Sequence, residues 1–380
     1  MPPAPKEPKG QKELDVIVTA TLDLVQRLQT VLSDINRNPI ATSPSSTQSS
    51  GQPPLNSLAL AQDSAALVRA HATKVSLLIV NEPFTPSALV GVIRELAQGP
   101  LPSLAASAET CTADRYTAVF RKELAWRCRS VLLELAKLLE KIPKDGKALS
   151  ASEQGFSAGK GSIALTGVLW AACDQVAALT KGGVGGFFVK KVEEWRDTLK
   201  DVMEELKEWG EQEPEEDEDE EDEEDDDSVH DSSEKTKQNL IDDFMSSDRT
   251  IPKSDPDKIR PRLETSLKRL RLVTLLYQAI VKRRIKKLPA IPPAEDADES
   301  ARAVPTKLND AAHVLEVLPD HFGDLAAAIY DLDPEEIDEM MDQCFTDAET
   351  VSNVLGQTWE GGKDEFTEWT EKFKTEIRKA

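Results

Sequence analysis

The stretch from Gly155 to Ser162 combines glycines with a lysine, as phosphate-binding loops do. A P-loop needs four residues between its glycines, a Ser or Thr directly after the lysine and a buried strand before it. Here three residues separate Gly155 from Gly159, Gly161 follows Lys160, and no strand pattern precedes them. The spacing therefore disfavours nucleotide binding and predicts a flexible loop between helices.

Asp331, Asp333 and Glu335 have the spacing of the first ligands in a calcium-binding loop. Such a loop needs a glycine at its sixth position and a glutamate at its twelfth. Those positions hold Glu336 and Asp342. Because Asp-Pro-Glu-Glu is the pattern of a helix N-cap, a first-turn proline and first-turn acids, these residues predict a helix start instead.

Cysteine and histidine show no metal-ligand or triad spacing. The cysteines form no CxxC pair and predict reduced, mostly buried thiols: Cys111, Cys128, Cys173 and Cys344. The four histidines form no i, i+4 pair, and His71 lies on an apolar helix face, which favours a core histidine with satisfied nitrogens. The sequence therefore predicts no catalytic residue, no metal and no cofactor, and favours a non-enzymatic protein.

The strongest compositional signal is an acidic run in which fourteen of the fifteen residues from 213 to 227 are Asp or Glu. The net charge of the chain is −23. Carboxylates this close repel one another, because they lie within the Debye length of about 8 to 10 Å. The run predicts a disordered linker over residues 211–256, acting as a spacer or as a docking segment for basic partners. Ser228, with Asp231 three residues later, is a predicted phosphorylation site.

Five bases in six residues form a basic cluster: Lys282, Arg283, Arg284, Lys286 and Lys287. The cluster has three open interpretations: a nuclear import signal, a contact for the acidic run of the same chain, or a solvated helix end. Nucleic-acid binding is disfavoured, because phosphate would repel so acidic a chain.

The elements that would position these residues are all helices. Ala, Leu, Glu and Lys dominate the periodic stretches, and aromatic residues make up 5% of the chain. We predict an all-α protein of two up-and-down helical bundles joined by the disordered acidic linker. The domains are a disordered tail at 1–12, a bundle at 13–210 with a flexible loop at 39–54, the linker at 211–256, and a second bundle at 257–380.

Heptad seams along these helices are candidates for partner binding. The seam after the linker contains Leu263, Leu267, Leu270 and Tyr277, with Thr274 as an imperfect position. A partner helix is expected to bind the groove beside that position, so the four apolar residues are the partner-binding candidates. Seams serve intramolecular bundles and coiled-coil dimers alike, so the oligomeric state stays open.

Targeting signals are not evident. Residues 1–11 are rich in Pro and Lys and lack the apolar run of a secretory signal. No stretch approaches eighteen uninterrupted apolar residues. We therefore expect a cytoplasmic and nuclear protein without a membrane partner.

One heptapeptide, Gly167–Cys173 (GVLWAAC), carries a family resemblance. Together with the helix at 187–209, the acidic linker and the helical C-terminal region, it resembles the cyclin-D-binding, GCIP-like family over about residues 55–356. The closely matching positions are Val168, Trp170, Ala172 and Cys173. The resemblance implies vinculin-like bundles and a non-enzymatic regulator that binds cyclin D and helix-loop-helix transcription factors.

The resulting hypothesis is a regulatory interaction protein with cyclin-like or helix-loop-helix partners. Two alternatives share its features: a cytoskeletal or adhesion adaptor built from helical bundles, and an acidic chaperone for basic proteins in which the acidic run binds. Cosedimentation with filaments would distinguish the adaptor from the regulatory interaction protein. Deletion of residues 211–227 would distinguish the chaperone, because only the chaperone binds its partner through the acidic run.

Overall fold

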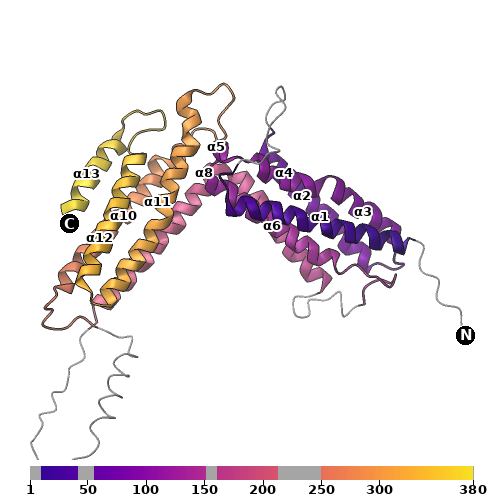
Figure 1. The fold of residues 1–380 in the computed structure, drawn as a ribbon, viewed down its shortest axis with the longest axis horizontal. Coiled ribbons are helices and arrows are strands. Elements are labelled where there is room, and N and C mark those ends of the chain that lie inside the picture. The colour runs from indigo at the N-terminus through magenta and orange to yellow at the C-terminus, as the bar shows by residue number, and fades with distance from the viewer. Residues whose placement is uncertain (1–9, 42–54, 151–160, 213–249, 380) are drawn as a thin grey trace, which may run out of the picture. The chain divides into compact units, whose positions relative to one another are not determined.

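A computed structural model describes residues 10–41, 55–150, 161–212 and 250–379, which form helices and connecting loops without a strand (Figure 1). This confirms the all-α prediction. The helices are α1 (Gln11–Arg37), α2 (Ser57–Val80), α3 (Pro86–Gln98), α4 (Pro100–Thr110), α5 (Ala113–Tyr116), α6 (Ala118–Leu139), α8 (Ser162–Gly210), α10 (Ile259–Arg283), the 3₁₀ helix η3 (Ile285–Lys287), α11 (Glu299–Tyr330), α12 (Pro334–Leu355) and α13 (Glu365–Lys379).

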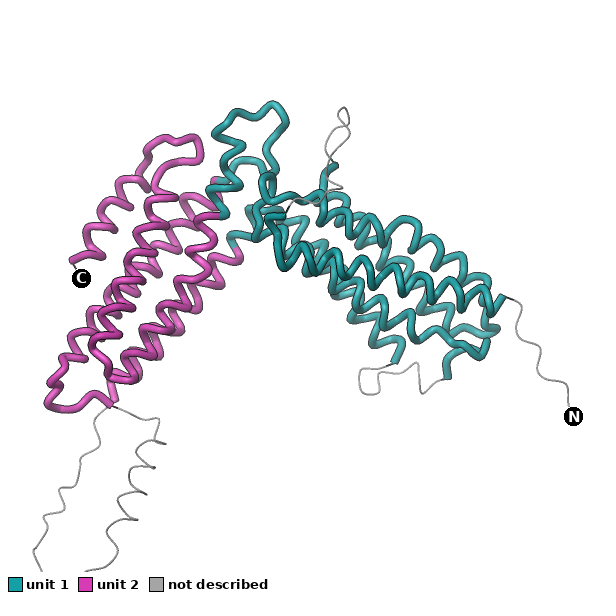
Figure 2. Tube along the Cα trace, in the orientation of Figure 1, with its two compact units in different colours: residues 1–189, 288–309 teal, residues 190–287, 310–380 magenta. Residues whose placement is uncertain are grey.

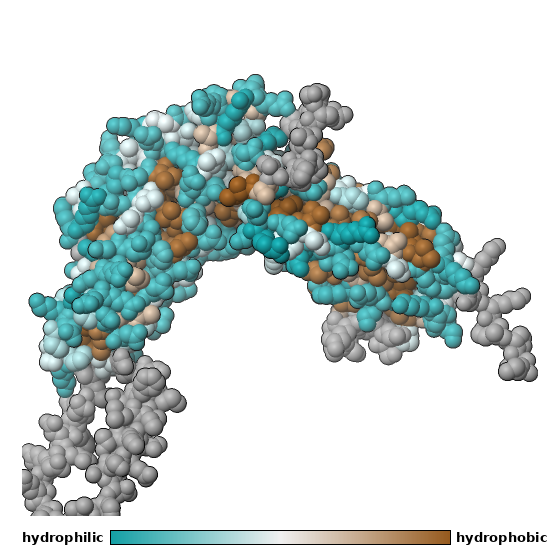
Figure 3. Space-filling view, in the orientation of Figure 1, coloured by the Kyte–Doolittle hydropathy of each residue, from teal (hydrophilic) through white to brown (hydrophobic). Residues whose placement is uncertain are grey.

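The chain divides into two compact units, shown in different colours in Figure 2. Unit 1 comprises residues 1–189 and 288–309, and unit 2 comprises residues 190–287 and 310–380. The predicted boundaries at 210 and 257 do not coincide with this division. On the face drawn in Figure 3, apolar side chains reach the surface of both units in patches between charged ones.

In unit 1, α1 packs beside α6 and α3, and α2 packs beside α4. Apolar residues of α1 follow a four-three spacing from Leu14, and this seam is the buried face of the helix, with Leu14, Val25 and Leu32 at its centre. Thr21, the imperfect position of that seam, is also buried, and its hydroxyl donates to the Ile17 carbonyl at 2.7 Å. The four-three spacing therefore identified the core face correctly.

Unit 1 contains a buried arginine, Arg121 of α6, whose side chain is 1% exposed. Its Nη1 donates to the carbonyls of Pro39 and Ala41 at 2.8 and 2.7 Å, and its Nε donates to the carbonyl of Ala108 at 3.4 Å. Burial lowers the pKa of Arg121. These neutral acceptors fix the chain after α1 against α4 and α6.

Helix α4 begins directly after α3 ends at Gln98. Pro100 is the first residue of α4 and Gly99 precedes it. A first-turn proline costs a helix nothing, because the first N–H groups have no partner within the helix. Gly99 and Pro100 therefore end one helix and start the next.

Helix α8 consists of two helical segments that meet at a kink. The kink lies at one non-helical residue, Gly183, with φ 61° and ψ −171°. A glycine adopts this conformation readily, so Gly183 absorbs the irregularity. The first 28 residues of α8 belong to unit 1 and the last 21 to unit 2.

In unit 2, α10 packs beside α12 and α13. The end of α8 packs there too: Trp209 contacts Tyr330 edge to face, with ring centroids 5.2 Å apart. A Cβ on Gly210 would lie 2.3 Å from Leu263, so α8 and α10 approach closely. The apolar residues at 188–209 thus pack against helices that follow the acidic run in the sequence. For this reason the boundary between the units falls at residue 189 and not at residue 210. Ile251, predicted to lie in the linker, is buried in this unit.

Candidate partner-binding surfaces

The α10 seam that we predicted to bind a partner lies in the core of unit 2. Leu263, Leu270 and Tyr277 are buried and Leu267 is half-buried. The Tyr277 hydroxyl donates to the Leu315 carbonyl at 2.7 Å, and burial raises the pKa of Tyr277 well above its usual value.

Thr274 does not mark a gap in this seam, because its hydroxyl donates to the Leu270 carbonyl at 2.9 Å. These residues therefore contact the chain's own helices and offer no open groove. This corrects the predicted placement of the partner-binding candidates.

The basic cluster separates into exposed and buried members. Lys282, Lys286 and Lys287 are exposed, whereas Arg284 is 1% exposed. Arg283 is half-buried and pairs with Glu365 at 3.2 Å. The cluster is thus not a uniformly solvated helix end, because one of its five charges belongs to the core.

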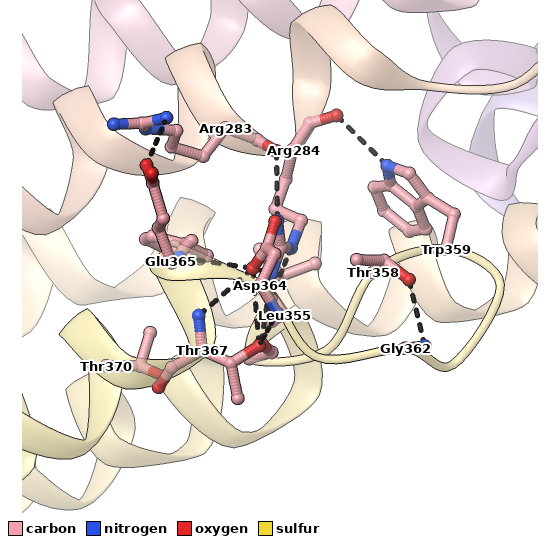
Figure 4. Close-up of polar contacts among 12 residues, drawn as sticks. Arg283, Arg284, Leu355, Thr358, Trp359, Gly362, Asp364, Glu365, Thr367 and Thr370 are labelled. Atoms are coloured by element: carbon pink, nitrogen blue, oxygen red, sulfur yellow. Dashed lines mark hydrogen bonds and ion pairs between the residues drawn. The ribbon is translucent and has the colours of Figure 1, made fainter.

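Arg284 joins three parts of unit 2 (Figure 4). Its guanidinium binds both carboxylate oxygens of Asp364 at 2.8 and 2.9 Å. It also donates to the carbonyls of Leu355 and Gly356, at 2.7 and 2.9 Å, which are the unpaired acceptors at the end of α12. Its charge lies 4.6 Å from the ring centroid of Phe366.

Asp364 also caps α13, since its Oδ1 accepts from the backbone N–H groups of Phe366 and Thr367, both at 3.1 Å. The Arg284 hydrogen bonds, followed by these caps, hold the pKa of the Asp364 carboxyl far below its usual value. Trp359 donates to the Arg284 carbonyl at 3.0 Å. Arg284 therefore fixes α13 and the loop before it against α10 and α12. Sequence analysis missed this role, although Asp364 was recognisable as an N-cap before an amphipathic helix.

A groove of about 330 Å³ lies between α10 and α13. We define the α10–α13 groove by Leu275, Ala279, Lys282 and Arg283 of α10 with Phe366 and Trp369 of α13. Leu275 is 45% exposed. Trp369 stacks between Phe366 and Phe373 at centroid distances of 5.6 and 5.5 Å, so its ring orientation is fixed.

A second surface lies on the first part of α8, in unit 1. We define the α8 face by the exposed positions between residues 163 and 178: Ile163, Gly167, Val168, Ala171, Asp174, Gln175 and Ala178. Asp174 is the one charge in this range, and it is paired with Arg69 of α2. The next exposed charge on the same side of the helix is Lys181, which borders the α8 face. Val168 is 50% exposed. An exposed helix face normally carries more charges, so the α8 face is a candidate interaction surface.

Buried contacts hold the α8 face in place. Trp170 donates through Nε1 to the hydroxyl of Thr73 at 3.2 Å, and the guanidinium of Arg69 lies 5.3 Å from the centre of its ring system. Ala172 and Cys173, from the same heptapeptide, are buried in unit 1. The heptapeptide therefore both anchors α8 and presents the α8 face.

The buried thiols and His71 have structural roles. All four cysteines are free and buried, as predicted, and burial raises the pKa of Cys128 and of Cys173 to about 12. His71 contacts the Leu67 carbonyl at 2.8 Å and Glu95 at 3.1 Å, which confirms a satisfied histidine. Asp333 accepts from the N–H groups of Glu335 and Glu336, which confirms the helix start. Among the described residues, no group of three or more His, Cys, Asp or Glu could hold a metal ion.

Comparison with known families places the α8 face inside a recognised domain. The family model described as "Grap2 and cyclin-D-interacting, N-terminal" matches residues 61–212, which include all of α8. Residues 61–212 therefore carry the N-terminal domain of the GCIP-like family. This confirms the resemblance first carried by the heptapeptide at 167–173.

A relative of this GCIP-like chain is an uncharacterized protein of Schizosaccharomyces pombe. The two are 22% identical over 316 residues, covering 83% of this chain and 82% of the relative. The similarity therefore extends beyond the matched N-terminal domain into the region that forms unit 2.

Several segments on which we made predictions lie outside the residues that the structure describes: the acidic run, Ser228, the Ser/Pro-rich segment 42–54 and the glycine-lysine segment 155–160. Among the helices that the structure does describe, α8 alone is long and apolar enough to cross a membrane. Its buried positions, including Leu169 and Val176, pack into unit 1, and a core helix has this composition as well.

Proposed function

We propose that this GCIP-like chain is a non-enzymatic regulator that binds a D-type cyclin through the α8 face. One observation carries the proposal: the matched cyclin-D-interacting domain contains an exposed apolar helix face, residues 163–178, in which the one charge is already paired. Helix-loop-helix factors, which the family resemblance implies, are a second class of partner for the same face.

The energetics favour the α8 face over the α10 seam as the contact. Fully burying an exposed Val or Ile side chain is worth about 1.5 to 3 kcal/mol. Ile163 and Val168 are 46% and 50% exposed, so part of this free energy is available without unfolding the bundle. The seam residues Leu270 and Tyr277 offer none, because they are already buried.

The test measures binding of purified D-type cyclin to the full chain by calorimetry. Val168→Glu places a charge in the contact and should weaken binding at least tenfold, since about 1.4 kcal/mol corresponds to a factor of ten. Thr198→Glu is the matched control, because Thr198 is exposed on the second part of the same helix and the charge change is identical. Binding unaffected by Val168→Glu, with the protein folded, would exclude the α8 face.

The proposal includes both cytoplasm and nucleus as the location of the protein. Lys282, Lys286 and Lys287 are exposed and available to an import receptor. Replacing these three lysines with alanine should lower the nuclear fraction of a fluorescent fusion. Arg284 must stay intact in this variant, because its loss would disrupt unit 2. An unchanged nuclear fraction would contradict the import role.

A further inference from the structure

The α10–α13 groove lies outside the matched domain and is a second interaction surface. Its floor is apolar, and its walls are held by Arg284 and by the Arg283–Glu365 ion pair. Two further contacts fix α13: Arg378 pairs with Glu349, and Lys374 donates to Asn353 at 3.1 Å. The groove is therefore formed before any partner arrives.

The charges along the groove are cationic. Arg271, Leu275 and Lys282 lie on one face of α10, because they are four and seven residues apart. Arg271 and Lys282 are exposed, and neither has a carboxylate partner among the residues that the structure describes. Glu365, the one acid lining the groove, is neutralised by Arg283.

We propose that the α10–α13 groove binds an acidic amphipathic helix of a protein partner. Apolar side chains of that helix would contact Leu275, Ala279 and Trp369, and its flanking carboxylates would contact Arg271 and Lys282. An elongated cleft between two helices fits a third helix that presents apolar anchors at i, i+3 or i+4, and i+7.

The net charge of −23 does not oppose this partner at close range. At physiological ionic strength the Debye length is about 8 Å, so the partner interacts mainly with charges close to the groove, which include Arg271 and Lys282. The same screening predicts that affinity falls as salt is raised.

The test selects 16-residue peptides from a displayed random library on the full chain, then measures the enriched peptide by fluorescence polarisation. Enriched peptides should carry helically spaced apolar anchors and an excess of Asp and Glu. Leu275→Glu should abolish binding and Lys282→Glu should weaken it at least tenfold. Lys141→Glu, an exposed change of equal charge in unit 1, should change affinity less than twofold.

A charge-reversed peptide, with Lys for its acids, should bind the Lys282→Glu variant more tightly than it binds the unaltered chain. Retained binding by Leu275→Glu, or enriched peptides without an acidic excess, would overturn the proposal. A full chain lacking residues 213–227 is the third arm. Binding that rises tenfold or more on this deletion would assign the groove to the acidic run and also overturn the proposal.

Discussion

Arg121 in unit 1 and Arg284 in unit 2 are the two largest fully buried side chains in the described part of the molecule. Arg121 donates only to neutral backbone carbonyls, those of Pro39, Ala41 and Ala108. Arg284 donates to two carbonyls and to the carboxylate of Asp364. Both charges are hydrogen-bonded, but only the second has a hydrogen-bonded carboxylate, whereas Arg121 interacts with Asp114 and Glu109 through their charges alone.

This difference shows how each unit holds an irregular segment. In unit 1 the arginine replaces water around the chain that follows α1, and no ionisable partner is needed. In unit 2 the arginine joins the end of α12 to the start of α13, and Asp364 completes the joint. The stability of unit 1 should therefore depend less on the ionisation of an acid at this site than the stability of unit 2 does.

Removing each buried charge should produce the largest effect and the clearest contrast. Arg284→Met should cost about 3 to 5 kcal/mol, because it removes the cation that pairs with Asp364 and the side-chain donor of the Leu355 carbonyl. Arg121→Met should cost less, about 1 to 3 kcal/mol, since only neutral acceptors lose a partner. Hydrogen exchange by mass spectrometry should show the loss in α13 for the first variant and near residues 38–41 for the second.

Arg283→Met is the control for the Arg284 variant. Its ion pair with Glu365 is exposed, with side-chain exposures of 40% and 84%, and such pairs contribute about 0 to 1 kcal/mol. If Arg283→Met and Arg284→Met lowered the free energy of unfolding equally, burial would not be what distinguishes these two neighbouring arginines.

The contrast between the two arginines also shows what the sequence could predict. The spacing of apolar residues indicates the α1 seam, and the N-cap Asp333 indicates the start of α12. Both signals are local, because Leu14 to Leu32 repeat on one face of a single helix and Asp333 caps its own helix. Four of the five residues in the basic cluster are at least partly exposed, and only Arg284 is buried.

Arg284 was missed because its partner Asp364 lies 80 residues away, and nothing in the local pattern separates it from Arg283. The unit boundary was missed for the same reason, since the end of α8 packs on helices beyond the acidic run. The α8 face was not predicted, because the apolar composition of this helix does not separate its exposed positions from its buried ones. Long-range pairing decides all three.

Gly183→Ala should have the next largest effect on stability, and this effect should be in unit 1. Its φ of 61° with ψ of −171° is a conformation that only glycine adopts readily, so the alanine costs about 1 to 3 kcal/mol. Because Gly183 belongs to unit 1, hydrogen exchange should rise in the first part of α8 while α13 stays protected. Unchanged exchange in both would mean that the kink relaxes without cost.

Acid should weaken unit 2 through Asp364 and should affect the Arg121 site less, because Arg121 has no hydrogen-bonded carboxylate among the described residues. The folded-state pKa of Asp364 is depressed by Arg284, and the unfolded value is about 3.9. The stabilisation is therefore fully present above the unfolded value and is lost as the pH falls below about 4 towards the folded value.

Urea unfolding between pH 6 and pH 2.5, followed by the exchange of α13, checks this prediction. Asp364→Asn should be less stable than the unaltered chain at pH 6 and should lose less stability on acidification. Two other arginine–carboxylate pairs, Arg262 with Asp338 and Arg378 with Glu349, remain in the variant and set the residual acid sensitivity of unit 2. Parallel pH curves for the two proteins would contradict the role of Asp364.

Gly186→Ala should have the smallest effect and the opposite sign to Gly183→Ala. Gly186 is exposed, lies within the helical part of α8, and a Cβ there would meet nothing within 4 Å. Alanine in a helix is favoured over glycine by about 0.5 to 1 kcal/mol, so this variant should stabilise the helix. Since the two glycines are three residues apart in one segment, their opposite signs, measured by thermal unfolding, would confine the irregularity of α8 to Gly183. A loss at both positions would instead mean that the whole segment 183–186 departs from helical geometry, and α8 would then be two helices separated by that segment.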